Sequence, residues 1–232
     1  MVLAEKKFIP KVFAAVARVA TVVRSLVAIE EGAMGPDKDC GYEGPFLKAI
    51  TGIPISMEGK TSACAHSSPV GNVAAACCDL WSNESVQNVK LLADMAPIVY
   101  MEQLEYDVRL FNEALKEGSE SVLNLQRMLV NSDIRFDPQA LVLSPENVIE
   151  ISKEIVKGEN YIDATKKGCL KGIEIIEEAI DNGKLVKDEK ETSWLNMLRD
   201  DVESIPINES EFVEETIPTL KPNKVLLSEY GL

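Results

Sequence analysis

The sequence is poor in positive charge and in histidine. Its 24 lysines and arginines face 38 aspartates and glutamates, so the formal net charge is −14 at pH 7, and it has one histidine. An acidic chain repels phosphates at any distance that salt does not screen. We therefore expect no nucleic acid among its partners. The remaining composition, 46% hydrophobic and 27% charged, excludes a disordered or collagen-like chain.

Secretory and membrane signals are lacking as well. The five cysteines are an odd number and no secretory signal precedes them, which argues against a disulfide framework and favours a reducing cytoplasm. The most apolar stretch, residues 13–29, is interrupted by Arg18 and Arg24 and lacks the clean run of about 20 apolar residues that spans a bilayer. The sequence therefore predicts a soluble, cytoplasmic protein with no membrane segment.

Residues that could carry chemistry gather in the first third of the chain. Residues 34–84 hold four of the five cysteines, His66 and six of the 13 glycines. Glycine and proline divide this part into short helices, short apolar runs and loops, in the alternation of an α/β fold. We expect a buried helix from Pro10 leading into a strand at 26–29, a helix at 45–51 closed by Gly52, a strand at 53–57, and a helix including 73–80 that Ser68 caps.

The rest of the chain shows helical spacing of apolar residues. Leu104, Val108, Phe111 and Leu115 recur at this spacing, and Gly118 ends the pattern. The last 30 residues are interrupted by prolines and are expected to wrap over something larger. Further helices are predicted at 120–131, 145–157 behind a Ser144 cap, 161–181 and 190–203.

Cys40 is the strongest candidate for a metal ligand. It lies in a loop directly after a predicted strand, at the sheet edge where α/β folds place their sites. The neighbouring Asp37 and Asp39 disfavour a free thiolate unless a cation is bound, so metal ligation is favoured over nucleophilic catalysis. The alternative is an inert loop cysteine.

The other candidates are weaker. Cys64 and His66 also follow a predicted strand, but two residues that are two positions apart in an extended loop point to opposite sides. Core packing is the preferred interpretation of Cys77, Cys78 and Cys169. Three carboxylates in or beside the loops could act as acids, bases or ligands, or simply be solvated: Glu43, Glu58 and Asp79.

Three stretches together resemble a known family. Residues 35–45 read GPDKDCGYEGP, residues 53–72 read IPISMEGKTSACAHSSPVGN, and residues 78–90 read CDLWSNESVQNVK. They closely resemble the zinc-containing subunit of methanol:corrinoid methyltransferases, and the resemblance runs from about residue 10 to the C-terminus.

The resemblance implies a (β/α)8 barrel of the TIM type with added helices, of which this chain is the C-terminal part. Residues 1–84 would form a barrel segment with the metal-site loops, and residues 85–232 a mainly helical portion. In the family a glutamate and two cysteines hold one zinc ion, and the second cysteine matches Cys40, with Cys64 as the fallback. Family members are about twice as long, so this chain alone is expected to be inactive.

The implied reaction is methyl transfer from methanol to the Co(I) corrinoid of a partner protein, in methanogenesis from methanol, with zinc as the Lewis acid on the alcohol oxygen. The implied partners are the corrinoid protein, methanol and further copies of the chain. Two alternatives remain open. One is a non-catalytic zinc-stabilised module with Cys40, Cys64, His66 and Cys77 or Cys78 as ligands. The other is an acidic helical interaction domain.

Overall fold

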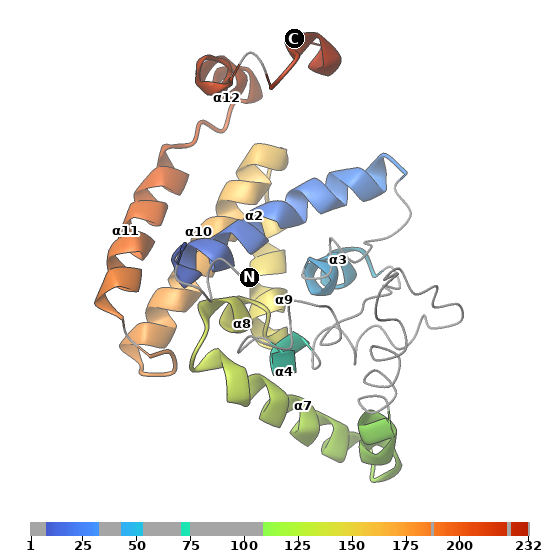
Figure 1. Ribbon diagram of the computed structural model, residues 1–232. Coiled ribbons are helices and arrows are strands. Elements are labelled where there is room, and N and C mark those ends of the chain that lie inside the picture. Colours follow the sequence, from blue (N-terminus) through green and yellow to red (C-terminus); the bar gives the residue numbers. More distant parts are fainter. Residues whose placement is uncertain are drawn as a thin grey trace.

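The described residues of the computed structural model are 8–32, 43–52, 71–74, 109–186, 188–221 and 224–231, and they form helices and turns without a strand. Helices α2, α8, α9, α10 and α11 make a bundle, and α7 extends from one end of it (Figure 1). Residues 109–116 are also helical. The bounds are α2 Lys11–Glu30, α3 Gly44–Thr51, α4 Gly71–Ala74, α7 Ser119–Ile134, α8 Pro138–Val142, α9 Pro145–Ile155, α10 Tyr161–Asp181, α11 Glu189–Ser204, α12 Glu209–Thr216, η5 Ile217–Thr219 and η6 Leu227–Tyr230.

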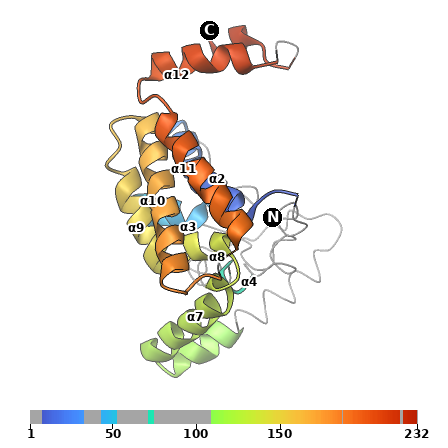
Figure 2. The same cartoon turned by 90° about the vertical axis from the view of Figure 1, so that its left-hand side faces the viewer.

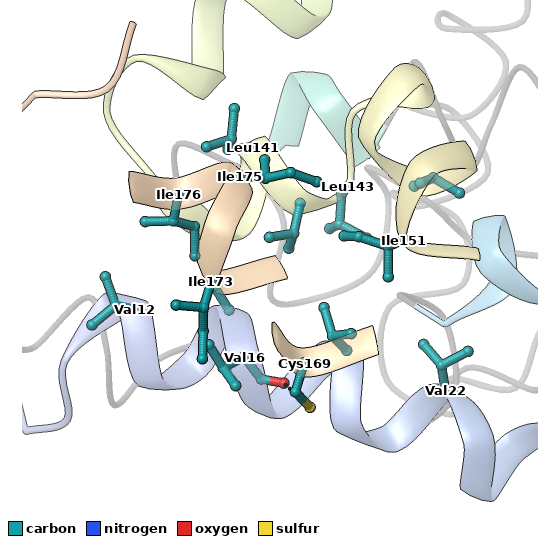
Figure 3. Packing of buried hydrophobic residues seen from close by; sticks show 14 of the residues in the cluster. Val12, Val16, Val22, Leu141, Leu143, Ile151, Cys169, Ile173, Ile175 and Ile176 are labelled. Carbon is teal, nitrogen blue, oxygen red and sulfur yellow. Dashed lines mark hydrogen bonds between the residues drawn. The ribbon is translucent and has the colours of Figure 1, made fainter. Parts of the chain in front are cut away.

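The core lies where α2 and α10 pack together (Figure 3). Ile173 and Ile176 of α10 are completely buried, and Val19 of α2 lies on the same seam. The close packing of α10 against α2 and α9 depends on two glycines of α10. A Cβ on Gly172 would lie 3.4 Å from a methyl carbon of Val19, and one on Gly168 would lie 2.7 Å from the side chain of Ile155.

A glutamate from a distant helix completes the N-terminus of α2. Pro10 precedes this helix and provides no side-chain cap. Instead, the carboxylate of Glu191 on α11 accepts hydrogen bonds from the backbone N–H groups of Lys11 (3.1 Å) and Val12 (2.9 Å). A carboxylate at a helix N-terminus satisfies free donors and interacts favourably with the helix dipole. This contact joins the first and last helices of the bundle.

Helix α2 is long and apolar enough, by length and composition, to cross a membrane. Eight of its residues are nevertheless buried by the remainder of the chain. The guanidinium Nε of Arg18 donates a hydrogen bond to the amide oxygen of Gln139 at 2.9 Å. Helix α2 therefore packs as a core helix of the bundle.

The strand predicted at 26–29 is wrong, because α2 runs without a break to Glu30. β-Branched residues favour strands, but Val22 and Val23, which precede this segment in α2, are buried in the core, and the helix continues through the half-buried Val27 and Ile29. The strand predicted at 53–57 and the Ser68 cap lie outside the described residues, and Gly71–Ala74 is the described part of the helix expected there. A (β/α)8 barrel is thus not tested by the described residues.

Most helix predictions are confirmed. Gly52 and Gly118 adopt left-handed or otherwise positive φ angles of 70° and 104°, as stop signals do. Helix α10 spans the predicted residues. Ser144 precedes α9 as expected but does not cap it with its side chain, since its hydroxyl donates to the carbonyl of Leu141 at 2.9 Å.

The last described residues do not return to the bundle. We call residues 206–231 the C-terminal arm; it contains α12, η5 and η6, and it stands clear of the other helices in both views (Figures 1 and 2). No described residue of the arm is buried. The expected wrapping over something larger is therefore not provided by this chain's described residues.

Candidate functional site

The loops that carry the proposed ligands lie largely outside the described residues. This applies to Cys40, Cys64 and His66, and so the proposed metal ligation is not tested by the structure. Within the described ranges no group of three or more His, Cys, Asp or Glu side chains is placed to hold a metal ion. The same limit applies to the remaining predicted positions: Asp37, Asp39, Glu58, Cys77, Cys78 and Asp79.

A buried carboxylate follows the segment that contains Cys40. Glu43 comes three residues after Cys40 and is 7% exposed, so it is not a solvated loop residue. Its carboxylate accepts a hydrogen bond from the hydroxyl of Thr21 on α2, and its backbone carbonyl accepts one from Leu47 N–H at 3.0 Å in α3. Glu43 therefore ties the end of this segment to both α2 and the start of α3.

A second buried carboxylate follows the segment that contains Cys64 and His66. Asp133 of α7 is 4% exposed, and one of its oxygens accepts hydrogen bonds from the backbone N–H groups of Asn72 and Val73, both at 2.8 Å. Its other oxygen accepts a hydrogen bond from the Ser132 hydroxyl at 2.8 Å. Asp133 therefore fixes α4, the helical turn just after that segment, to α7.

The environment of Asp133 opposes its charge. Burial raises the pKa of its carboxyl above the usual value, and the hydrogen bonds from Val73, Ser132 and Asn72 act in the opposite direction. Asp133 was missed at the sequence level, and Glu43 was considered there only as an acid, a base, a ligand or a solvated residue. Asp133 lies in a helix, 61 and 60 positions from Asn72 and Val73, and no local motif marks such a contact.

Cys169 is a packing residue, as predicted. It is 3% exposed, points toward α2 beside Val16 (Figure 3), and burial raises the pKa of its thiol to about 12. A thiol with this pKa is protonated at physiological pH and is a poor nucleophile.

The chain is similar to known proteins over nearly all of its length. Residues 1–231 match the sequence model of the family described as MtaB, methanol-cobalamin methyltransferase B subunit. A methanol–corrinoid protein co-methyltransferase from Methanosarcina barkeri (strain Fusaro / DSM 804) is 41% identical over 209 residues, which cover 90% of this chain and 45% of that protein. The chain thus spans about half the length of this relative.

A solved structure gives the same result. The crystal structure of the methanol:cobalamin methyltransferase complex MtaBC from Methanosarcina barkeri matches with a TM-score of 0.75 and 38% sequence identity. The match covers 93% of this chain and 48% of the solved chain. The resemblance found in the three sequence stretches is therefore confirmed, and it extends over nearly all of this chain.

Proposed function

The chain belongs to the methanol-cobalamin methyltransferase B subunit family, and we propose that it forms part of an enzyme that transfers the methyl group of methanol to the corrinoid of a partner protein. The observation that carries this proposal is the match over residues 1–231, with 41% identity to a relative named for this reaction. Since the chain spans about half of that relative, it would supply the C-terminal part of the catalytic subunit.

The reaction is demanding because hydroxide is a poor leaving group. The methyl group passes from the alcohol oxygen to the reduced corrinoid, which provides both electrons of the new bond. The carbon–oxygen electron pair stays with the oxygen, which takes up a proton and leaves as water. When bound, zinc would supply the Lewis acidity that weakens the carbon–oxygen bond.

Cys40 is the residue of this chain that we propose as a zinc ligand, with Cys64 as the fallback. The described residues do not form a metal site by themselves, so this assignment rests on the sequence resemblance. The chain's described contribution is to hold the ends of the two loops. Glu43 and Asp133 bind the residues that follow these loops to α2, α3 and α7. A site needs such support because small displacements of its groups lower its activity.

The same proposal covers organisation and location. Residues 1–84 would carry the metal loops, and residues 85–232 their helical support, with α2 packed against α10 of the second part. We propose a (β/α) barrel segment for the loop-bearing residues, a cytoplasmic location, and assembly with further copies of the chain.

The test combines this chain with a polypeptide that supplies the remaining half of the family sequence. Zinc content is measured, and methyl transfer from methanol to a Co(I) corrinoid is followed by the absorbance change of the corrinoid. We expect transfer with both polypeptides together, and a large loss of zinc and of transfer for Cys40→Ser. Cys169→Ala is the matched control and should keep its zinc, because this thiol is buried in the helical core.

Two outcomes would overturn parts of the proposal. A folded, zinc-loaded pair without methyl transfer would contradict the assigned reaction. Full zinc content in Cys40→Ser, together with zinc loss in Cys64→Ser, would transfer the ligand role to Cys64.

A further inference from the structure

The carboxyl group of Asp133 lies inside a closed set of contacts between α4 and α7. The two helices pack against one another, as both views show (Figures 1 and 2). One carboxyl oxygen, Oδ2, accepts hydrogen bonds from the N–H groups of Asn72 and Val73, and the other, Oδ1, lies 2.8 Å from the hydroxyl oxygen of Ser132. All of these residues belong to this chain, so the contact needs no partner molecule.

The hydroxyl group of Ser132 has more acceptors than its single hydrogen can serve. Its oxygen lies 2.7 Å from the carbonyl oxygen of Leu129 and 2.8 Å from Oδ1 of Asp133. The side-chain amide of Asn72 donates a hydrogen bond to the same hydroxyl oxygen at 2.8 Å. When Asp133 is ionised, its carboxylate and the Leu129 carbonyl therefore compete for one hydrogen.

A proton on Oδ1 removes this competition. The acid O–H then donates to the hydroxyl of Ser132, which in turn donates to the carbonyl of Leu129, while Oδ2 still accepts both N–H groups of α4. Asp133 is 4% exposed, and a buried carboxylate without a cation is costly. Uptake of a proton thus costs no hydrogen bond and removes a buried charge.

The charged groups around this site do not hold the carboxyl in its ionised form. Neither α4 nor α8, the described elements that pack most extensively on α7, contains an ionisable residue. At the start of α8, Asp137 pairs with the ammonium group of Lys11 at 3.3 Å. The other ionisable side chains of α7 and its C-cap are exposed: Glu120, Arg127 and Arg135. No cation of the described residues pairs with Asp133, and burial, the largest influence, raises the pKa of its carboxyl.

We propose that Asp133 is a proton-binding site of the folded chain, and that its proton strengthens the contact between α4 and α7 by making the carboxyl a donor to Ser132. When α4 leaves α7, the carboxyl meets water and has the ordinary pKa of about 4, so the closed contact binds the proton better than the open one. This stabilisation is present below about pH 4 and is lost as the pH rises through the folded-state pKa.

The position of α4 gives this pH dependence a consequence. Helix α4 directly follows the segment that contains Cys64 and His66. The protonation of Asp133 therefore sets how firmly the end of this segment is held. The inference concerns contacts within the chain and is independent of methyl transfer.

The first experiment titrates the aspartate carboxyl groups of the full chain. NMR spectroscopy follows each carboxyl carbon with pH, and the signal that is absent from Asp133→Asn belongs to Asp133. We expect this signal to titrate above about pH 4. Asp163 is the matched control and should titrate at lower pH, because Lys167 donates a hydrogen bond to its carboxylate and lowers its pKa.

The second experiment measures the contact by hydrogen exchange of the N–H groups of Asn72 and Val73. The unchanged chain and Asp133→Asn are compared at equal pH, which removes the intrinsic pH dependence of exchange. The asparagine amide keeps an acceptor oxygen and a donor toward Ser132 but does not titrate. We expect similar rates below about pH 4. Between this value and the folded-state pKa, exchange in the unchanged chain should rise relative to the variant by up to about tenfold per pH unit.

A third variant tests the acceptor itself. Asp133→Ala removes the oxygen that binds both N–H groups, and it should speed their exchange by about tenfold at every pH. If this variant does not fold, the titration and Asp133→Asn still decide the matter.

Three results would overturn the proposal. An Asp133 signal that titrates at or below the pH of the Asp163 signal would exclude the proton-binding site. A constant ratio of exchange rates across the pH series would exclude the pH-dependent contact. Unchanged exchange in a folded Asp133→Ala would show that this carboxyl does not hold α4. None of these results depends on the outcome of the methyl-transfer assay.

Discussion

Helices α10 and α12 are both rich in charged residues, yet they lie in opposite surroundings. Nine of the 21 residues of α10 are buried, mainly against α2 and α9, whereas none of the eight residues of α12 is buried. Both helices begin with an asparagine whose side chain accepts a backbone hydrogen bond. The two helices therefore differ in tertiary burial and length and have the same kind of cap.

This difference shows which part of the chain can hold itself together. Burial of apolar surface provides most of the helix stability in a folded protein, and local signals contribute less. The bundle around α2 and α10 has its own core, while the arm has the local signals of a helix without a core. Three measurements on the folded chain test this contrast.

The largest effect is expected from the same substitution made in each region. Ile176→Ala removes a completely buried side chain between α10 and its neighbours, and it should lower the free energy of unfolding by about 2–5 kcal/mol. Ile217→Ala in the arm should change it by less than about 0.5 kcal/mol. Urea unfolding followed by circular dichroism measures both. Equal losses would show that the arm belongs to the same cooperative unit as the bundle.

A smaller effect is expected at the anchor on α7. Asp133→Ala would leave the N–H groups of Asn72 and Val73 without their acceptor and should cost about 1–3 kcal/mol. Asp133→Asn keeps an acceptor oxygen and removes the buried charge, so its free energy of unfolding should be close to that of the unchanged protein. Chemical denaturation at pH 7 distinguishes the two variants. A matching loss in both would mean that the charge itself, and not the acceptor, holds α4.

The smallest effect is a pH dependence at the start of α10. Asp163 accepts hydrogen bonds from Lys167 and from Glu159 N–H, and these hold the pKa of its carboxyl below the usual value. A lowered pKa in the folded state stabilises the fold above the unfolded value of about 4, and this contribution is lost as the pH falls through the folded value. Asp163→Asn should therefore be less stable by about 0.5–1 kcal/mol at pH 7.

The test for Asp163 is the difference in the free energy of unfolding between Asp163→Asn and the unchanged protein. Measured by urea unfolding from pH 7 down to acid, this difference should shrink as Asp163 becomes protonated. A difference that stays constant with pH would exclude the carboxylate charge as its cause.

Helix predictions succeeded where the signal was local and periodic. Pro45 and Gly52 delimit α3, and apolar spacing correctly predicted α10. The prediction failed at residues 26–29, where a β-branched run suggested a strand. Only the structure shows that these half-buried or exposed residues continue the helix, because a short apolar run suits either a strand or a helix.

The candidate site likewise has residues that the sequence predicted and residues whose role only the structure shows. Its loop residues, Cys40 above all, were found from sequence position and resemblance, and their assignment stays a prediction. The anchoring roles of Glu43 and Asp133 could not be predicted, although Glu43 was noted as a candidate acid, base or ligand, since these roles arise from contacts with Thr21 and with Asn72 and Val73 in remote segments. A carboxylate in a sequence gives no indication of which distant N–H or hydroxyl it will meet.

The sequence by itself determined the family, the helix boundaries set by proline and glycine, and the packing role of Cys169. These depend on residue order and on local backbone preferences, which a single chain segment carries within it. The tertiary structure decided that α2 is one continuous core helix, that buried carboxylates hold the ends of the loops, and that the described residues leave the arm without a buried side chain. These features depend on which surfaces meet in space, and the free energy of their burial exists only when distant segments come together.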